Sequence, residues 1–142
     1  MEETIQLLQE CNAGIKMGIS SINDVLDTVE NEELKNLLIT SREHHEKLGD
    51  KTHELLNSYH DTGKEPPFMA KAMAEIKTNM KLMSTPTDQK GADIIAEGCD
   101  MGIRSVSKYL NQYGDASKEA RQIAKELVRI EEELSKELRK YL

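Results

Sequence analysis

The chain has 142 residues, of which 32% are charged and only 4% aromatic, and its formal net charge is −7. This length fits one domain with a core of its own, and the residue usage is typical of a helical bundle and disfavours a β-sandwich. The negative charge argues against a nucleic-acid partner or an anionic membrane surface. No apolar run approaches the roughly 20 residues of a membrane-spanning helix, and the N-terminus lacks a signal-peptide pattern. We therefore expect a cytoplasmic protein with a single domain over residues 1–142.

The first half of the chain predicts a helical hairpin over residues 1–62. Apolar residues recur every three or four positions over residues 3–30, which is the spacing of one helix face. Asn31 and the two glutamates after it are typical of an N-cap and the first turn of a second helix, whose apolar face continues to Tyr59. The Asp-Thr-Gly of residues 61–63 is a helix stop and ends the hairpin.

The second half predicts one additional helix and then a second hairpin. After a proline pair, residues 66–84 carry large apolar side chains at helical spacing, namely Met69, Met73, Ile76, Met80 and Met83. Pro86 is well placed as the first residue of the next helix, because proline lacks the N–H that a first turn leaves unpaired. Gly114 and Asp115 then turn the chain into a last helix, so the second hairpin covers residues 86–142.

The two hairpins repeat one another. Residues 11–16, Cys-Asn-Ala-Gly-Ile-Lys, return 88 positions later as Cys-Asp-Met-Gly-Ile-Arg at residues 99–104. In the second helix of each hairpin the shift is 86 positions, which places Glu131 where the first hairpin has His45. We interpret the chain as a duplicated hairpin whose copies bury their apolar faces on each other. The two equivalent cysteines fall on these faces, so we expect both to be buried, free thiols.

Two hairpins joined by a long crossover form the topology of ferritin-like bundles. Leu37-Leu38 followed by residues 43–48, Glu-His-His-Glu-Lys-Leu, is similar to the helix in which that superfamily carries Glu-x-x-His. On these features the chain resembles the ferritin-like superfamily over essentially its whole length, including small members of unknown function, some associated with bacterial spore coats. The resemblance implies an all-α, ferritin-like four-helix bundle built from two repeated hairpins, with residues 66–84 as an extra crossover helix.

The di-metal site that this resemblance would imply fails residue by residue. Such a site needs a Glu on each of two helices and Glu-x-x-His on each of the other two. Neither His44 nor His45 has a Glu three positions before it, and the last helix contains no histidine. Glu10 and Glu97, on the remaining two helices, lie far from the apolar stripes and should face solvent. A ferritin-like redox enzyme is therefore the least favoured function.

His45 and Glu131 remain as candidate site residues, because each falls near the middle of an apolar stripe. Both lie near mid-helix, level with Gly14 and Gly102, where missing side chains leave space. We expect them to interact directly or through one water, as a buried polar pair that fixes helix register. One alternative is that they hold a single divalent metal or small ligand, with a cysteine or Asn12. Another is that they reach solvent through the small residues around them.

The Met stripe also has two interpretations. Met69, Met73, Ile76, Met80 and Met83 can pack the crossover helix onto the bundle as core filler, or they can offer a pliable surface to a partner or second subunit. We predict a homodimer that uses this helix or an adjacent apolar edge. The function expected from the sequence is a non-enzymatic, structural or protein-interaction role as a homo-oligomer without a cofactor. The alternative is a metal- or cofactor-binding protein that uses the bundle centre.

Overall fold

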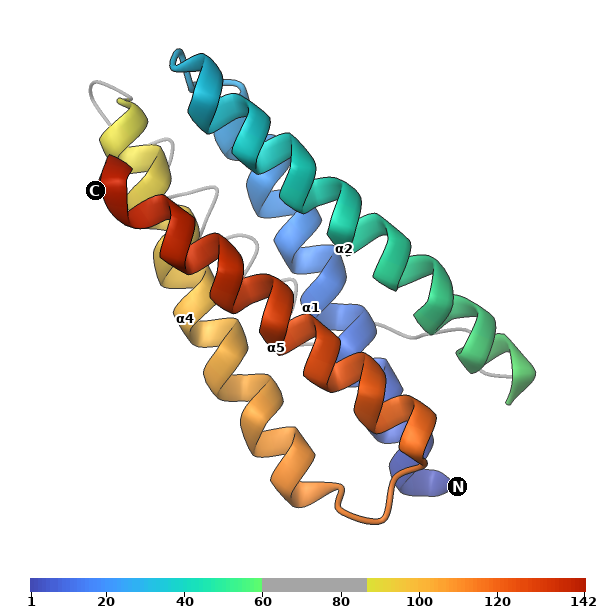
Figure 1. Cartoon of the computed structure of the whole chain (residues 1–142). Helices are drawn as coiled ribbons and strands as arrows, with labels where there is room; N and C mark the ends of the chain where they lie inside the picture. Colours follow the sequence, from blue (N-terminus) through green and yellow to red (C-terminus); the bar gives the residue numbers. More distant parts are fainter. Residues whose placement is uncertain (60–86) are drawn as a thin grey trace.

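The computed structural model describes residues 1–59 and 87–142, and within these ranges every regular element is helical (Figure 1). The elements are α1 Glu2–Leu26, α2 Glu32–Ser58, α4 Asp88–Gln112 and α5 Lys118–Leu138, followed by a short 3-10 helix, η1, at Arg139–Tyr141. The all-α prediction is thus confirmed for this part of the chain, and the four long helices form a bundle. None of the described helices is long and apolar enough to cross a membrane. The helix predicted at residues 66–84, with its Met stripe, lies outside the described residues.

Side-chain caps explain where three of the helices begin. Asn31, Thr87 and Ser117 each accept a hydrogen bond from the backbone N–H three residues further on, which pairs a donor that the first turn leaves free. The predicted Asn31 cap is confirmed. The prediction that Pro86 begins the next helix is wrong, because Thr87 has extended backbone angles and caps a helix that begins at Asp88.

Both helices of the first hairpin are shorter than their apolar patterns predict. α1 ends at Leu26, where Thr28 Oγ1 donates to the Val25 carbonyl and competes with continuation of the helix. Val29 is nevertheless only 4% exposed, so the apolar stripe runs on into the turn although the helix does not. α2 ends at Ser58, ahead of the Asp-Thr-Gly that we expected to stop it.

The two hairpins hold each other's turns by hydrogen bonds from side chains to backbone. The carboxylate of Asp88, at the start of α4, accepts from the N–H groups of Glu30 and Asn31 at 2.8 and 3.0 Å, just before α2 begins. A carboxylate that accepts two backbone N–H groups satisfies donors that the turn would otherwise leave to water. The starts of α2 and α4 therefore lie at the same end of the bundle.

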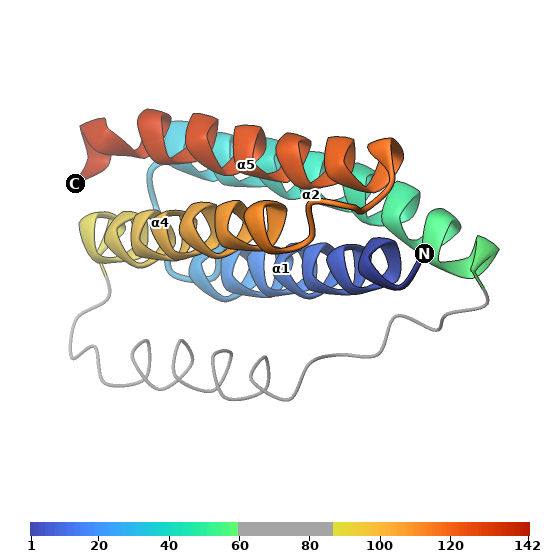
Figure 2. The ribbon, with the colours of Figure 1, turned by 90° about the horizontal axis from the view of Figure 1, so that it is seen from below.

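The opposite end carries the matching arrangement. Glu3 Oε2, in the first turn of α1, accepts from the Asp115 N–H at 2.9 Å, and Thr4 Oγ1 accepts from the Ser117 N–H at 2.8 Å. The starts of α1 and α5 thus lie together, and in chain order the helices run up, down, down and up (Figure 2). The end of α2 and the start of α4 consequently lie at opposite ends of the bundle.

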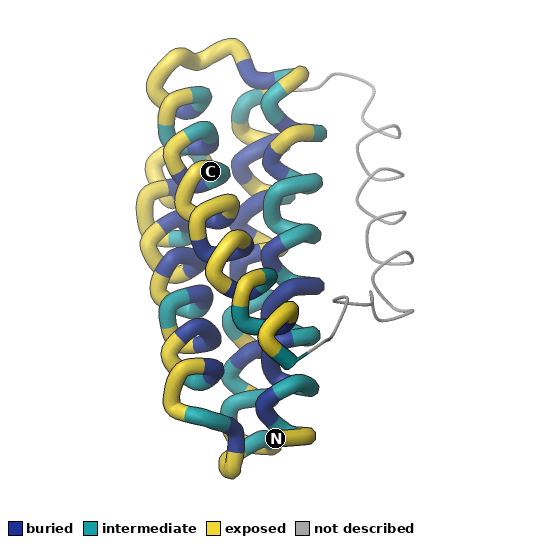
Figure 3. The backbone as a smooth tube through the Cα atoms, turned by 90° about the vertical axis from the view of Figure 1, so that its right-hand side faces the viewer, coloured by how far each residue is buried: buried dark blue, intermediate teal, exposed yellow. Residues whose placement is uncertain are grey.

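The core consists of two apolar clusters, one toward each end. Each hairpin packs most extensively within itself, α1 also packs on α4 and α2 on α5, and α1 meets α5 across the diagonal. Buried residues recur along every helix at intervals of about one turn (Figure 3). The cluster near the start of α1 includes Leu7, Leu8, Ile15, Leu56 and Leu127. The other includes Ile22, Val25, Leu34, Leu38 and Leu138. The predicted burial of both free cysteines is confirmed.

Candidate functional site

A buried polar contact lies between the two apolar clusters. His45 Nε2, from α2, lies 3.0 Å from Glu131 Oε1, from α5, and the two residues are 1% and 7% exposed. The other ring nitrogen of His45, Nδ1, lies 2.8 Å from the backbone carbonyl oxygen of Ser41, one turn earlier on α2. The prediction that His45 and Glu131 meet on inward faces is therefore confirmed. A metal-binding role for the pair stays a prediction.

The remaining two helices approach this contact through glycines. A Cβ atom at Gly18, on α1, would lie 2.9 Å from both Cδ2 and Nε2 of His45, and one at Gly102, on α4, would lie 3.6 Å from the Glu131 carboxyl carbon. The prediction that Gly102 leaves space beside the pair is confirmed, but the same prediction for Gly14 is wrong. Gly14 lies one turn away and faces Leu127, so Gly18 is the residue that makes room for the imidazole.

Cys99, on α4, is the third polar group at this centre. Burial raises the pKa of the Cys99 thiol far above its usual range, and the charge of Glu131 and a hydrogen bond to its carboxylate raise it further. The sequence left open which cysteine would accompany the pair, and the structure selects Cys99. Cys11 lies in the apolar cluster near the start of α1, where burial followed by the charge of Glu10 raises its pKa to about 12.

The two hydrogen bonds of His45 favour its charged form. Burial lowers the pKa of His45, but the hydrogen bond and the charge of Glu131, together with the Ser41 carbonyl, raise it above its ordinary value. The geometry gives the reason, because the Ser41 carbonyl and the Glu131 carboxylate are both acceptors. Only the imidazolium can donate an N–H to each of them at once. The centre is thus a buried imidazolium–carboxylate pair.

The order of the groups at this centre disfavours nucleophilic catalysis. An activated thiol needs a base such as histidine beside it, and its pKa must fall. Here the Glu131 carboxylate lies between Cys99 and His45, and the pKa of the thiol rises. In the described ranges, no group of three or more His, Cys, Asp or Glu side chains is arranged to hold a metal.

The other residues compared with ferritin-like metal ligands in the sequence lie away from this centre. His44 and Glu97 are exposed, and Arg42, three positions before His45, donates to Asn23 at the surface. The prediction that Glu10 faces solvent is wrong. Glu10 is half-buried, and burial raises its pKa while a hydrogen bond from Tyr109, on α4, lowers it in part. Sequence periodicity missed this contact because it assigns a residue to a face and says nothing of the partner across the helix interface.

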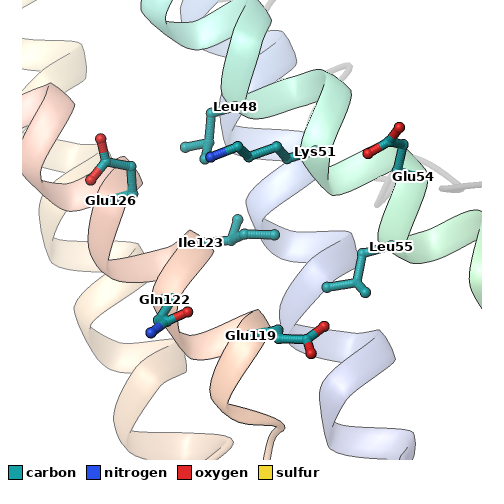
Figure 4. Close-up of a pocket in the computed structure, with 8 residues that line it drawn as sticks. All are labelled: Leu48, Lys51, Glu54, Leu55, Glu119, Gln122, Ile123 and Glu126. Atoms are coloured by element: carbon teal, nitrogen blue, oxygen red, sulfur yellow. The ribbon is translucent and has the colours of Figure 1, made fainter.

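An open groove lies between α2 and α5, apart from the buried centre. It encloses about 480 Å³ and is lined by Leu48, Lys51, Glu54 and Leu55 of α2 and by Glu119, Gln122, Ile123 and Glu126 of α5 (Figure 4). A smaller hollow of about 180 Å³ continues it toward the middle of the bundle and shares Leu48, Lys51 and Glu126 with it. Neither His45 nor Glu131 lines either space. Sequence periodicity did not predict this groove.

Comparisons with protein-family models, with curated proteins and with solved structures found no match to this chain.

We predict that His45 and Glu131 are energetically coupled. His45→Leu and Glu131→Leu should each cost about 3–5 kcal/mol, because each leaves a buried charge without its partner, while the double variant should recover about 1–3 kcal/mol of the summed loss. Folding raises the pKa of His45. The pair's contribution to folding stability is therefore complete below the pKa of His45 in the unfolded chain, near 6.5, and is lost as the pH rises through its pKa in the folded protein. Urea melts of the four proteins at pH 6 and pH 9 measure the coupling, which should be larger at pH 6. Additive effects at both pH values would contradict the pairing.

The close approach of α1 predicts opposite effects for two glycine substitutions. Gly18→Ala should destabilise the protein by about 1–3 kcal/mol, because the new methyl group would lie 2.9 Å from the imidazole of His45. Gly98→Ala, on α4, is the matched control, since nothing lies within 4 Å of its Cβ position. That substitution should stabilise the protein by up to about 1 kcal/mol through helix propensity. Thermal melts compare the two, and a Gly18→Ala protein as stable as the control would show that the centre is not tightly packed.

Proposed function

We propose that this chain is a non-enzymatic, structural or protein-interaction protein that works as a homodimer. The observation that carries the proposal is the closed polar centre. Both ring nitrogens of His45 are engaged within the protein, and the contact at Gly18 leaves no room for even a methyl group. A reaction centre has to admit a substrate, and ligand sites are open concavities. The groove between α2 and α5 is open, but it lies apart from this centre.

A distant relation to ferritin-like bundles is part of this proposal. Two observations support it: the helices run up, down, down and up, and residues at equivalent places of the two hairpins meet at the centre. The departure from the family lies in the chemistry of the centre. With Arg42 at the surface and Glu97 exposed, the bundle keeps one histidine and one carboxylate where the family holds two metals. A fold of this kind supports functions other than metal chemistry, because function depends on the site.

The proposal of a homodimer rests on the apolar stripe at residues 66–84, which lie outside the described part of the chain. Five large apolar side chains share one predicted helix face, and the four described helices already form a core of their own. We propose that this predicted face associates with a second copy of the chain. Methionines suit such a face, since their flexible side chains adapt to the partner surface.

The dimer can be tested by sedimentation velocity over a range of concentrations. We expect the parent protein to show a reversible dimer, and Met73→Glu with Met80→Glu to sediment as a monomer, because charges on an apolar interface lose their hydration. Met101→Glu is the control: Met101 is 57% exposed on α4 and outside the stripe, so its substitution should leave the dimer unchanged. A parent protein that stays monomeric at every concentration would refute the proposal.

The second candidate function is binding of a single divalent metal at the centre. His45 and Glu131 supply one imidazole and one carboxylate, both of which are ligand types of Zn²⁺, whereas the described ranges contain no third His, Cys, Asp or Glu arranged with them to hold a metal. In addition, Ser41 Oγ is buried without a hydrogen-bond partner in the described structure, and such atoms commonly contact a water or ion.

Elemental analysis separates the two candidates. We expect protein purified without chelator to contain less than about one tenth of an equivalent of Zn, Fe or Mn, because metal binding would have to displace the proton shared by a buried, fully paired imidazolium. A stoichiometric metal that disappears in Glu131→Gln would establish the second candidate in place of the first.

A further inference from the structure

The groove between α2 and α5 runs along both helices and has an apolar floor. Its apolar floor consists of Leu48 and Leu55, which lie seven residues apart on one face of α2, and of Ile123 from α5. Together with the adjoining hollow, the groove follows α2 from His44 to Leu55, which corresponds to about 17 Å of helix at 1.5 Å per residue. Three turns of an amphipathic helix match this length, and parallel rows of side chains on two neighbouring helices accept the side chains of a third.

The charges along the groove are unevenly distributed. In its half toward the middle of the bundle, Arg129 pairs with Glu126 and Glu133, and Lys51 reaches from α2 toward α5 (Figure 4). The hydrogen bond from Arg129 and, less strongly, the nearby Lys51 lower the pKa of Glu126, so this carboxylate is already compensated.

The other half of the groove is acidic. Glu54 and Glu119 flank Leu55, and Figure 4 shows Glu119 extending from α5 toward α2. Among the residues that line the groove, Lys51 is the one basic side chain against three glutamates. The last turn of α2 adds to this field, because the C-terminal end of a helix carries partial negative charge and no basic residue occupies that turn. An occupant therefore needs apolar side chains for the floor and positive charge for this end.

We infer that the groove between α2 and α5 binds an amphipathic helix of a partner protein, with Lys or Arg side chains beside Glu54 and Glu119. The apolar ridge of that helix contacts Leu48, Leu55 and Ile123. Its cations flank the ridge, where they supply the positive charge that the acidic half lacks. This inference rests on the proposed interaction role and names the kind of partner. It is argued separately from the homodimer, which rests on the apolar side chains of residues 66–84.

Two designed peptides test the inference. Both are 18-residue helices with leucines along one face, and they differ only in whether lysines or glutamates flank that face. In fluorescence anisotropy titrations at about 0.1 M salt, the lysine peptide should bind the parent protein saturably and one to one. The glutamate peptide should bind at least about tenfold more weakly, because two like-charge contacts replace two attractive ones.

A charge-reversed variant and a matched control decide whether binding occurs in the groove. Glu54→Lys with Glu119→Lys should invert the preference, so that the glutamate peptide binds more tightly. Asp93→Lys with Glu97→Lys makes the same change in net charge at exposed positions of α4 and should keep the parent's preference for the lysine peptide. If the first variant melts early, Glu54→Gln with Glu119→Gln should still lose about tenfold in affinity for the lysine peptide.

The inference would be overturned by equal affinity for both peptides, by an inverted preference in the α4 control, or by the absence of saturable binding. Displacement of the peptide by unlabelled parent protein, with the same dependence on Glu54 and Glu119, would also overturn it and would assign the groove to a second copy of this chain. Sedimentation of the parent protein measures the homodimer separately, so failure of one proposal is distinguishable from failure of the other.

Discussion

The contact between His45 and Glu131 is the constraint around which the bundle is arranged. Two ionised groups withdrawn from water require a partner within hydrogen-bond distance, and here they satisfy each other at 3.0 Å in a layer between two apolar clusters. The remaining hydrogen-bond capacity of the imidazole is used by its own helix, at the Ser41 carbonyl. Gly18 and Gly102 follow from the same constraint, because α1 and α4 can close over the pair only where a side chain is missing. A slip of α2 against α5 by one turn would separate the two charges inside the core, so the pair also sets the register of the helices.

The ends of the bundle are held by a second, reciprocal set of contacts. The start of each hairpin accepts hydrogen bonds from the turn of the other, through Asp88 at one end and through Glu3 and Thr4 at the other. These contacts orient the hairpins so that α2 and α4 run the same way. The polar centre is thereby enclosed on all four sides, whereas the groove between α2 and α5 remains open.

Much of this architecture could be predicted from the sequence, because apolar spacing and helix capping depend on residues close together in the chain. Apolar spacing predicted the four described helices, Asn31 predicted the start of α2, and the equivalence of His45 with Glu131 in the repeat predicted that they would face one another. Spacing is less informative at helix ends. Val29 continues the stripe of α1 beyond the end of the helix, since a turn can bury an apolar residue as well as a helix can. The Met stripe lies outside the described residues, and its role stays a prediction.

The sequence by itself determined the class of fold, the faces that turn inward and the identity of the central pair. The tertiary structure alone decided how the faces are matched across the helix interfaces. In the folded bundle, Gly18 rather than Gly14 lies against the imidazole of His45. Cys99 is the cysteine that neighbours Glu131, and Glu10 contacts Tyr109. The tertiary structure also created the groove, whose lining comes from two helices more than 60 residues apart in the chain. The reason is geometric. Periodicity assigns a residue to one side of its helix within about a quarter turn, but its neighbours depend on the relative height and rotation of two helices, which only the packing of the whole bundle determines.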